Sequence, residues 1–277
     1  MTTTTSRNAV IAEEGSAQRP QRVRHTPKFR QLEVVNVERI TAHIVSIRFQ
    51  GEDLHDFVSA SFDDHVKFMI PATPGSELLL PSLGPDGIKF PTGVPRPIMR
   101  DYTPRSFDGR SHELTIEYAL HGDGPVAQWA AQAKPGQRAA IGGPRGSTVI
   151  SLDYDWHLLV GDETALPAIS RRLEELPGNT QAIVIIETGD AADQRPLKSS
   201  AQVNVQWLVQ HGKSGLVDAV RALQLPMGEG FAWAAGESAT ILAVRHVLVD
   251  EFRLDKHHVK AAAYWRRGAA AHHEHLG

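Results

Sequence analysis

The stretch Trp156-His157-Leu158-Leu159-Val160-Gly161-Asp162-Glu163-Thr164-Ala165 decides the fold of the second half of the chain. Residues 156–160 form an apolar run short enough for a buried strand, and a helix-like pattern follows over residues 165–176. Gly161 permits the sharp turn between them, and Thr164 can cap the helix. A strand, a glycine turn and a helix in this order are typical of an open parallel sheet, which binds dinucleotides at such a turn. The fuller glycine fingerprint of many dinucleotide sites is absent from this stretch.

The alternation of strand and helix continues to residue 265. Four further apolar runs are short enough for buried strands, at residues 182–187, 203–209, 231–235 and 259–265. Helix-like stretches at residues 215–223 and 238–252 separate the later runs. The pattern predicts a parallel sheet with helices on both faces, in an α/β domain over residues 151–277.

Residues 27–150 show a different pattern, in which short β-type runs are broken by glycine and proline. The runs lie at residues 32–37, 41–49, 65–70, 113–120 and 137–141. Several short strands at this spacing predict a small β-barrel or sandwich. One helix interrupts it, beginning at Pro125 and ending before Pro135-Gly136. The domain boundary is expected near residues 146–154, and residues 71–97 are expected to form a long loop.

The composition excludes several classes of protein and cofactor. With 29 lysines and arginines against 32 aspartates and glutamates, the net charge is −3, so the chain lacks the positive charge that binds nucleic acid. Cysteine is absent, which excludes disulfides, cysteine-ligated zinc and iron–sulfur clusters. If the protein transfers electrons, an organic cofactor or haem must therefore carry them.

Residues 1–26 hold few large apolar side chains and are predicted to form a disordered leader. No apolar run approaches the ~20 residues of a membrane span, and no secretory signal is visible. We therefore expect a cytoplasmic protein without membrane insertion. Histidine pairs such as His257-His258 and His272-His273 lack the spacing of metal ligands, so no metal site is predicted.

The most informative stretch for chemistry is Arg100-Asp101-Tyr102-Thr103-Pro104-Arg105. It gathers a cation, a flat aromatic ring and a hydroxyl within four residues. That set suits a ligand with a phosphate, an aromatic ring and a ring nitrogen that needs a hydrogen bond. An ordinary edge strand with solvated arginines fits the spacing equally well.

Two glycine-rich turns point to phosphate binding. Residues 117–126 read as a strand, a turn at His121-Gly122-Asp123-Gly124 and the start of the Trp129 helix, and backbone amides at such a helix start can bind a diphosphate. Gly142-Gly143-Pro144-Arg145-Gly146-Ser147 offers further amides, a hydroxyl and a cation. The second turn fits a domain linker as well.

Six motifs in the same order resemble the siderophore-interacting protein family, which belongs to the ferredoxin-NADP reductase superfamily of flavoproteins. The motifs are Asp64-His65-Val66-Lys67, residues 100–107, His121-Gly122-Asp123-Gly124-Pro125, Gly143-Pro144-Arg145-Gly146-Ser147, Gly161-Asp162-Glu163-Thr164-Ala165-Leu166-Pro167 and Tyr264-Trp265-Arg266-Arg267-Gly268. The resemblance covers residues 28–268. Six motifs in order are far more specific than any single one.

The resemblance implies a six-stranded Greek-key barrel that binds FAD over residues 27–150, followed by an α/β domain that binds NAD(P)H. Arg100 is expected to contact the FAD diphosphate, Tyr102 to stack on the flavin, and Thr103 to hydrogen-bond near the flavin N5. The remaining expected FAD contacts are Tyr118, Ala119, His121, Gly124, Val126, Trp129 and Ser147. The expected NAD(P)H contacts are Gly161, Asp162, Glu163, Thr164 and Ala165.

The sequence does not decide whether NADH or NADPH is the preferred electron donor. Glu187 ends the second predicted strand of the α/β domain, where a carboxylate can bond a ribose hydroxyl and discourage a 2′-phosphate. A solvated strand end fits the same position. NADH, NADPH and a reduced ferredoxin therefore all remain possible electron donors.

Basic side chains are implied to hold the substrate, an anionic iron(III) chelate. The family places cations at the positions of Lys67 and Arg266, and Arg267 follows directly. Another basic residue often follows Gly268 in the family, where this chain has Ala269 and Ala270, so Arg267 or His272 is expected to substitute. Two or three cations in one cleft raise the local concentration of an anion.

The implied function is a ferric-siderophore reductase that passes electrons from NAD(P)H through FAD and releases iron(II), and that acts as a monomer. No side chain needs to serve as acid, base or nucleophile, because the flavin carries the chemistry. Two alternatives stay open. One is a flavin-dependent oxidoreductase for another acceptor, and the other is a non-catalytic siderophore carrier or sensor on the same fold.

Overall fold

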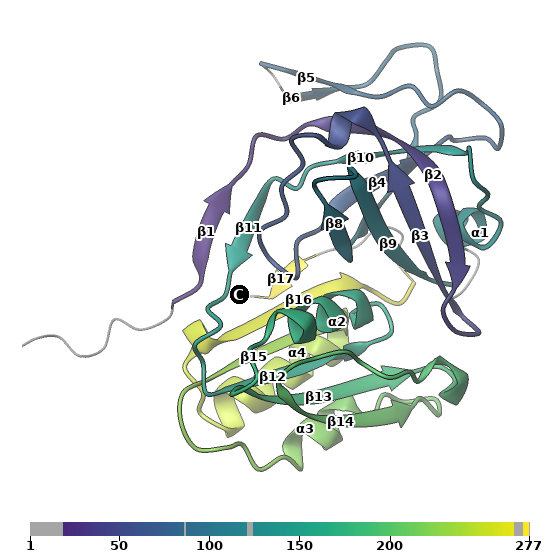
Figure 1. Cartoon of the computed structure of the whole chain (residues 1–277). Helices are drawn as coiled ribbons and strands as arrows, with labels where there is room; N and C mark the ends of the chain where they lie inside the picture. Colours follow the sequence, from purple (N-terminus) through teal and green to yellow (C-terminus); the bar gives the residue numbers. More distant parts are fainter. Residues whose placement is uncertain (1–18, 86, 121–123, 269–273, 277) are drawn as a thin grey trace, which may run out of the picture.

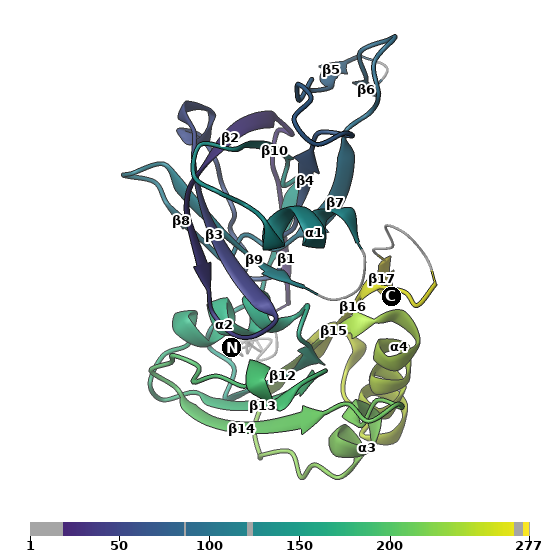
Figure 2. The same cartoon turned by 90° about the vertical axis from the view of Figure 1, so that its right-hand side faces the viewer.

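The protein folds into a curled antiparallel sheet followed by an α/β unit, stacked as Figure 1 shows. This computed structural model describes residues 19–276 except 86, 121–123 and 269–273. A quarter turn shows the curled sheet above the α/β unit (Figure 2), and Phe62 and Ile44 of the upper part share a core cluster with residues of the lower part. The predicted fold class, a β-barrel followed by a parallel-sheet domain, is confirmed.

The curled sheet has seven strands in the order β7-β4-β10-β2-β3-β9-β8. They are β2 (Phe29–Arg39), β3 (Ile44–Gln50), β4 (Val66–Ile70), β7 (Ile98–Tyr102), β8 (Ser106–Asp108), β9 (Glu113–Ala119) and β10 (Arg138–Gly142). The expected number was six. The additional strand is β8: Pro104 has no N–H to donate, so β7 ends at Tyr102 and a new strand begins at Ser106.

Alternate side chains along the strands of the curled sheet point into its core. Along β9, the side chains of Leu114, Ile116 and Tyr118 are buried, and those between them are half-buried. The short helix α1 (Pro125–Ala131) packs on this core through Val126 and Ala130. A 3-10 turn, η1 (Glu52–Leu54), adds Leu54 to the same cluster.

A small hairpin projects from the curled sheet (Figures 1 and 2). It consists of β5 (Ser82–Gly84) and β6 (Gly87–Lys89), paired antiparallel. It lies inside residues 71–97, where the sequence predicted a long loop without strands. Its exposed apolar side chains Leu83 and Ile88 explain why no core pattern marked it.

The N-terminal segment contains a strand that the sequence did not predict. β1 (Gln21–Arg24) pairs antiparallel with β11 (Gly146–Val149), with Val23 opposite Ser147. The prediction of a disordered leader through residue 26 is therefore wrong for residues 21–24, and residues 1–18 lie outside the described part of the chain. β1 is held by backbone hydrogen bonds to a distant strand, which composition does not reveal.

The α/β unit is built on five parallel strands in the order β14-β13-β12-β15-β16, with antiparallel β17 at one edge. They are β12 (Trp156–Asp162), β13 (Gln181–Thr188), β14 (Gln202–Val209), β15 (Gly230–Glu237), β16 (Val259–Trp265) and β17 (Glu274–Leu276). Every residue of β12 is buried, as expected for a central parallel strand covered on both faces.

Helices cover both faces of this sheet. Leu159 of β12 packs in the cluster that contains α2 (Leu166–Glu175), whereas Leu158 and Val160 pack with α3 (Leu216–Arg221) and α4 (Ser238–His246). The remaining turns are η2 (Ala191–Asp193), the π-helical η3 (Val247–Glu251) and η4 (Lys256–His258). No helix among the described residues is long and apolar enough to cross a membrane.

Candidate functional site

An aromatic cluster lies where β7 ends. The rings of Tyr102 and Tyr118 are 4.5 Å apart between centroids, and Phe68 lies 5.9 Å from Tyr102. Trp129 of α1 joins the cluster at 5.3 Å from Phe68. The structure thus brings together Tyr102, Tyr118 and Trp129, three residues predicted for the cofactor site, with Ala119 at the end of the same strand as Tyr118.

Two polar groups at this cluster are left for a ligand. The Tyr118 hydroxyl is fully buried and has no hydrogen-bond partner in the described part of the chain. The half-buried Arg100 guanidinium bonds the Met99 carbonyl at 2.8 Å and forms no ion pair with a described residue. Burial raises the pKa of both tyrosine hydroxyls, Tyr102 and Tyr118, so both are neutral donors. These residues fit a flat ring carrying acceptor atoms and a phosphate.

Thr103 links this cluster to the α/β sheet. Its side chain is buried and faces the Tyr264 phenol of β16. Burial raises the pKa of Tyr264 well above its usual value, the Asp63 carboxylate adds to the rise, and the neighbouring Thr103 side chain opposes it. The strand that carries Arg100 and Tyr102 therefore ends against the strand that carries the basic C-terminal residues.

Ser147 does not point to an open site. Its hydroxyl donates to Asp64 at 2.7 Å, and it accepts from the Ala60 amide at 3.2 Å and from His25 Nε2 at 2.7 Å. Burial raises the pKa of Asp64 within this network. Because all three hydrogen-bonding positions of the hydroxyl are used internally, the prediction that Ser147 contacts phosphates has no support in these contacts.

The glycine turn before α1 is described only in part. Gly124 is the N-cap residue of α1 and is exposed, with no side-chain cap. Val126 points into the barrel core, so only its backbone could face a ligand. His121 lies outside the described residues.

The turn after β12 is built around a buried carboxylate. A side chain at Gly161 would approach the Ala235 carbonyl to 2.5 Å, which is why glycine is needed there. Asp162 accepts hydrogen bonds from Thr164 N at 2.9 Å and from Trp265 Nε1 at 2.8 Å. Its side chain is thus used to fix the edge of the sheet, and Glu163 and Thr164 are left partly exposed beside it.

Glu187 has a structural partner as well. Its carboxylate accepts from the Gly215 amide at 2.6 Å and from Gln210 Nε2 at 3.3 Å, and the residue is 4% exposed. It is therefore not a solvated strand end, and part of its acceptor capacity is used inside the protein. Its role is to hold the start of α3 against β13.

A pocket lies at the carboxyl edge of the sheet, and a hollow adjoins it. The pocket is lined by Asp162, Glu163, Glu187, Gln210, Ser214, Leu216, Glu237, Thr240, Trp265 and Arg267. The hollow is lined by Gly212, Lys213, Ser214, Val217, Ala239, Thr240, Ala243 and Arg267. Sequence reasoning missed Lys213, Glu237 and Trp265 as site residues. The sequence pattern that could have identified them is their position at or just after the end of a predicted parallel strand, because the carboxyl ends of parallel strands meet at one edge of the sheet.

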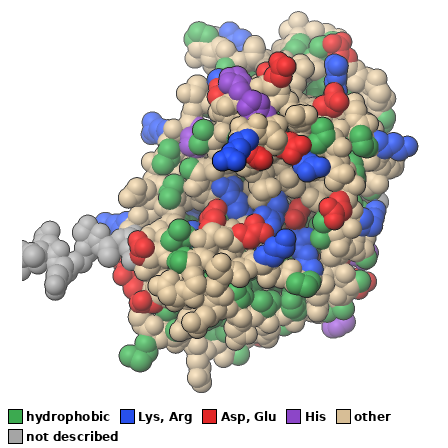
Figure 3. Space-filling model, in the orientation of Figure 1, with side chains coloured by type: hydrophobic (Ala, Val, Ile, Leu, Met, Phe, Trp, Pro, Cys, Tyr) green, Lys and Arg blue, Asp and Glu red, His purple; other side chains and the backbone are tan. Residues whose placement is uncertain are grey.

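The predicted substrate cations differ in their surroundings. Lys67 is half-exposed and pairs across the strands with Asp101 at 2.6 Å. Arg266 and Arg267 are exposed and form no ion pair with any residue that the structure describes, and the Arg267 amide contacts Glu237 at 3.4 Å. Figure 3 shows basic and acidic side chains mixed across the middle of this face of the molecule. Ala269, Ala270 and His272 lie outside the described part.

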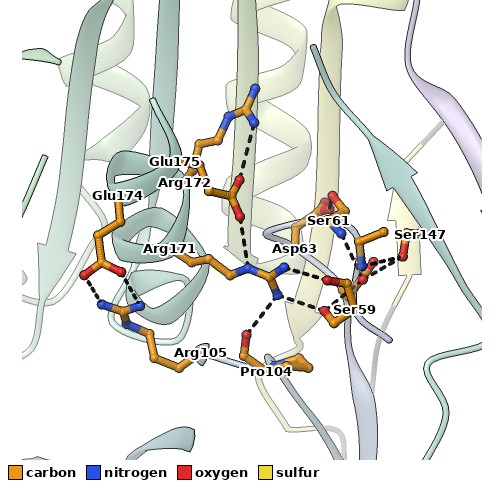
Figure 4. A network of polar contacts seen from close by, with 12 residues as sticks. Ser59, Ser61, Asp63, Pro104, Arg105, Ser147, Arg171, Arg172, Glu174 and Glu175 are labelled. Atoms are coloured by element: carbon orange, nitrogen blue, oxygen red, sulfur yellow. Dashed lines mark hydrogen bonds and ion pairs between the residues drawn. The ribbon is translucent and has the colours of Figure 1, made fainter. Parts of the chain in front are cut away.

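The segment after Thr103 is clamped by helix α2 (Figure 4). Arg171 donates to Ser59 Oγ at 2.8 Å, to the Ser59 carbonyl at 2.8 Å and to the Pro104 carbonyl at 3.1 Å. Arg105 forms a two-bond ion pair with Glu174, at 2.9 and 2.6 Å. These contacts fix the end of the Arg100–Arg105 stretch relative to the α/β sheet.

Two family models match successive parts of the chain. The first, described as the siderophore-interacting FAD-binding domain, matches residues 33–148. The second, described as siderophore-interacting protein, matches residues 154–268. The boundary between them falls in the residues that join β11 to β12.

Curated proteins and solved structures are similar over nearly the whole chain. An NADPH-dependent ferric-chelate reductase of Escherichia coli is 38% identical over 249 residues, which cover 89% of this chain and 96% of that protein. The ferric vibriobactin reductase ViuB of Vibrio cholerae is 32% identical, covering 88% and 93%. A siderophore utilization protein from T. fusca has a similar structure, with a TM-score of 0.85, 35% identity and coverage of 93% and 100%.

Proposed function

This chain belongs to the siderophore-interacting protein family, and we propose that it is a ferric-siderophore reductase that passes electrons from NADPH through FAD to an iron(III) chelate. The observation that carries the proposal is the hydrogen bond, 3.1 Å long, from Arg171 of α2 to the Pro104 carbonyl directly after Thr103. It brings the strand end expected to hold the flavin to the sheet expected to hold the nicotinamide. The similarity to two reductases of ferric chelates supports the choice of substrate.

The residues that would hold FAD are those of the aromatic cluster and its polar neighbours. Tyr102 offers a half-buried ring, Tyr118 a hydroxyl without a partner in the described part of the chain, and Arg100 a cation for the diphosphate. Thr103 is placed to present a hydroxyl at the domain junction. When bound, FAD accepts a hydride from a nicotinamide and passes electrons on singly, which suits a one-electron acceptor such as iron(III).

NADPH is the donor that the sheet edge favours over NADH. Glu187 accepts hydrogen bonds from the Gly215 amide and from Gln210, so part of the acceptor capacity that a ribose hydroxyl would need is already taken. Lys213 and Arg267 line the neighbouring hollow and supply positive charge for a 2′-phosphate. A reduced ferredoxin is the alternative donor.

The chelate would be held by Lys67, Arg266 and Arg267. Arg266 and Arg267 are exposed beyond the end of β16, and Lys67 lies on β4, next to the Tyr102 strand. Exposed cations attract an anionic chelate at long range and lose this effect as salt rises. Because reduction to iron(II) weakens binding by hard oxygen donors, the chelate would release its metal there.

The cellular location and the oligomeric state of the protein are also part of the proposal. We place the reaction in the cytoplasm and expect the protein to act as a monomer. Cell fractionation tests the first statement, and light scattering coupled to size-exclusion chromatography tests the second.

The direct test uses the full chain loaded with FAD under anaerobic conditions. Purified protein is mixed with NADPH, NADH or reduced ferredoxin, and iron(II) released from a ferric siderophore is followed with a ferrous-specific dye. We expect iron(II) release with NADPH. Flavin reduction without iron(II) would favour another acceptor, and chelate binding without flavin reduction would favour a carrier.

A matched pair of lysine variants tests the substrate site. Lys67→Ala is expected to raise the KM for an anionic ferric chelate several-fold at low salt, because a nearby cation is lost, and to leave FAD content unchanged. Lys89→Ala, on the projecting hairpin, is the control and should keep the wild-type KM. Equal KM values for both variants would remove Lys67 from the site.

A further inference from the structure

Asp162 is the acceptor of four hydrogen bonds at the carboxyl edge of the sheet. One carboxylate oxygen accepts from the Thr164 amide and hydroxyl, and the other accepts from the Glu237 amide at 3.0 Å and from the Trp265 indole at 2.8 Å. All four partners are donors. An ionised carboxylate has about four acceptor sites, so this set is filled only when Asp162 is charged.

The carboxylate ties three strands together. Asp162 ends β12, the Glu237 amide ends β15, and Trp265 ends β16. A β-bulge lies at residues 236 and 237, where Gly236 has φ +150° and a side chain there would come within 2.5 Å of the Asp162 carboxylate. The local backbone is therefore arranged to let this oxygen reach both neighbouring strands.

We propose that Asp162 is a positioning residue for the pocket at the carboxyl edge of the sheet, where the electron donor would bind: its charged carboxylate holds the Trp265 indole in the pocket wall, and protonation of Asp162 releases that indole. Asp162, Trp265, Glu237 and Arg267 all line the pocket. Trp265 directly precedes Arg266 and Arg267, so its position also sets where these cations leave the sheet. The link to the donor rests on the proposed function, whereas the hydrogen bond between Asp162 and Trp265 does not.

The proton equilibrium of Asp162 lies close to physiological pH. Burial raises the pKa of this carboxyl to about 6, the Glu163 carboxylate adds to the rise, and the hydrogen bonds from Thr164 and Trp265 oppose it. The other charged or titratable groups facing it are Glu187 of β13, Glu237 of β15, Tyr264 of β16 and Arg267 after β16. Arg267 is exposed and is the one cation among these groups, so the balance favours a raised pKa.

A second Trp–Asp pair, between Trp233 of β15 and Asp63 of the barrel part, provides an internal comparison. The Trp233 indole donates to the buried Asp63 carboxylate at 3.0 Å. Burial raises the pKa of Asp63, but the Lys260 ammonium at 2.6 Å, together with the hydrogen bonds from Trp233 and Ser61, outweighs it, so that pKa lies below its usual value. The two pairs share the same donor and acceptor, and they differ in whether a cation neutralises the carboxylate.

Proton gain by Asp162 would remove one acceptor position. A protonated carboxyl carries a hydrogen that must itself be donated, and the four groups facing Asp162 are donors. The two bonds from Thr164 close a local turn within two residues. The other two bonds are long-range, but the Glu237 donor is a backbone amide fixed at the end of β15, whereas the Trp265 donor is a side chain that can turn away. The bond from the Trp265 indole is therefore the one expected to break.

The experiment follows the indole N–H signals of the full chain, as purified, by ¹H–¹⁵N NMR from about pH 8 to about pH 5. The chain has five tryptophans, and Trp265→Phe and Trp233→Phe assign the two signals. We expect the Trp265 signal to shift with a midpoint near pH 6 and the Trp233 signal to stay constant. A Trp265 signal that does not titrate in this range overturns the proposal, whatever the reductase activity.

The functional consequence is tested with Asp162→Asn. We expect the KM for NADPH to rise roughly tenfold at neutral pH with kcat changed less, the effect of losing one hydrogen bond to a charged group. The 2′-phosphate of NADPH titrates in the same pH range, so the variant is compared with wild type at each pH. In wild type, protonation of Asp162 should cause a step near pH 6 in the KM for NADPH. This step should be absent in Asp162→Asn. A wild-type KM and pH profile would contradict the role.

Trp265→Phe keeps the proposal testable if the asparagine variant does not fold. It removes the indole N–H and leaves Asp162 in place. We expect the change in the KM for NADPH near pH 6 that is due to Asp162 to be lost in Trp265→Phe as well. If Trp265→Phe keeps this change, the proposal is contradicted. If the NMR titration is seen but no NADPH is oxidised, the proposed function fails and the hydrogen bond stands.

Discussion

At the scale of single residues, the buried Tyr118 hydroxyl is the sharpest probe of the cofactor site. It is fully buried and has no partner among the described residues. A buried polar group without a hydrogen bond costs about 1–3 kcal/mol of stability. A chain that retains such a group in its core has an uncompensated cost until a ligand supplies the acceptor.

Tyr118→Phe should therefore separate stability from binding. We expect the unfolding free energy of the FAD-free protein to rise by about 1 kcal/mol, and the affinity for FAD to fall about tenfold, because the hydroxyl loses its role as donor. Chemical denaturation measures the first quantity, and flavin fluorescence titration measures the second.

The control makes the same change in the α/β unit. Tyr154 is also buried, but it packs against Phe231 in the α/β unit, outside the aromatic cluster. Tyr154→Phe should leave FAD affinity unchanged. If Tyr118→Phe binds FAD as tightly as wild type, this hydroxyl does not face the cofactor.

At the scale of elements, helix α2 connects the two parts of the molecule. It covers one face of the parallel sheet, and its Arg171 side chain reaches Ser59 and Pro104 in the barrel part. Pro104 follows the Tyr102-Thr103 segment directly. Loss of this helix contact would therefore loosen the segment expected to hold the flavin.

Arg171→Ala is expected to lower the free energy of unfolding by about 2–3 kcal/mol, because three hydrogen bonds from a charged group to the barrel part are lost. Urea denaturation measures the change. Arg221→Ala is the matched control, since Arg221 is exposed and pairs with Glu251 on the surface, and a smaller change is expected. If Arg171→Ala and Arg221→Ala lower the free energy of unfolding equally, the contacts of Arg171 with the barrel part contribute no more stability than a surface ion pair.

At the scale of the whole molecule, one hydrophobic cluster crosses the boundary between the two parts. Phe62 and Ile44 of the barrel part pack with Leu159 and Trp233 of the α/β sheet. The Phe62 and Trp233 rings are 5.5 Å apart and meet edge to face. Since a shared core couples the parts energetically, we expect them to unfold together.

Phe62→Ala should lower the unfolding free energy by about 3–5 kcal/mol and shift the whole transition. Far-UV circular dichroism and tryptophan fluorescence should report coincident curves for wild type and variant. Val58→Ala, a truncation at a half-exposed position, is the control and should change stability little. Two separate transitions, with only one moved by Phe62→Ala, would show independent domains.

Much of the fold follows from local pattern. The alternation of Leu114, Ile116 and Tyr118 predicts β9, and the run at residues 156–160, apolar except for His157, predicts the central strand β12. The order of strands and helices predicts the parallel sheet, and the six motifs in sequence predict the family. The alternation of apolar side chains and the order of the motifs can be read from the sequence, because both depend only on residue types and their spacing along the chain.

The partners of polar side chains could not be predicted in this way. Ser147 looked like a phosphate ligand, and Glu187 looked like a ribose ligand or a solvated end, yet each is used by internal hydrogen bonds. Asp162 reaches Trp265 across 103 residues. Whether a polar group is free for a ligand depends on which groups folding brings to it.

The sequence alone thus determined the two-part architecture, the absence of thiol chemistry and the placement of the aromatic strand and the glycine turn, because these depend on composition and short-range spacing. Only the tertiary structure decided which of the predicted residues are free. It showed that the Tyr118 hydroxyl has no partner among the described residues, that Ser147 is engaged and that Asp162 is buried, since burial and hydrogen-bond supply are set by contacts between segments far apart in the chain.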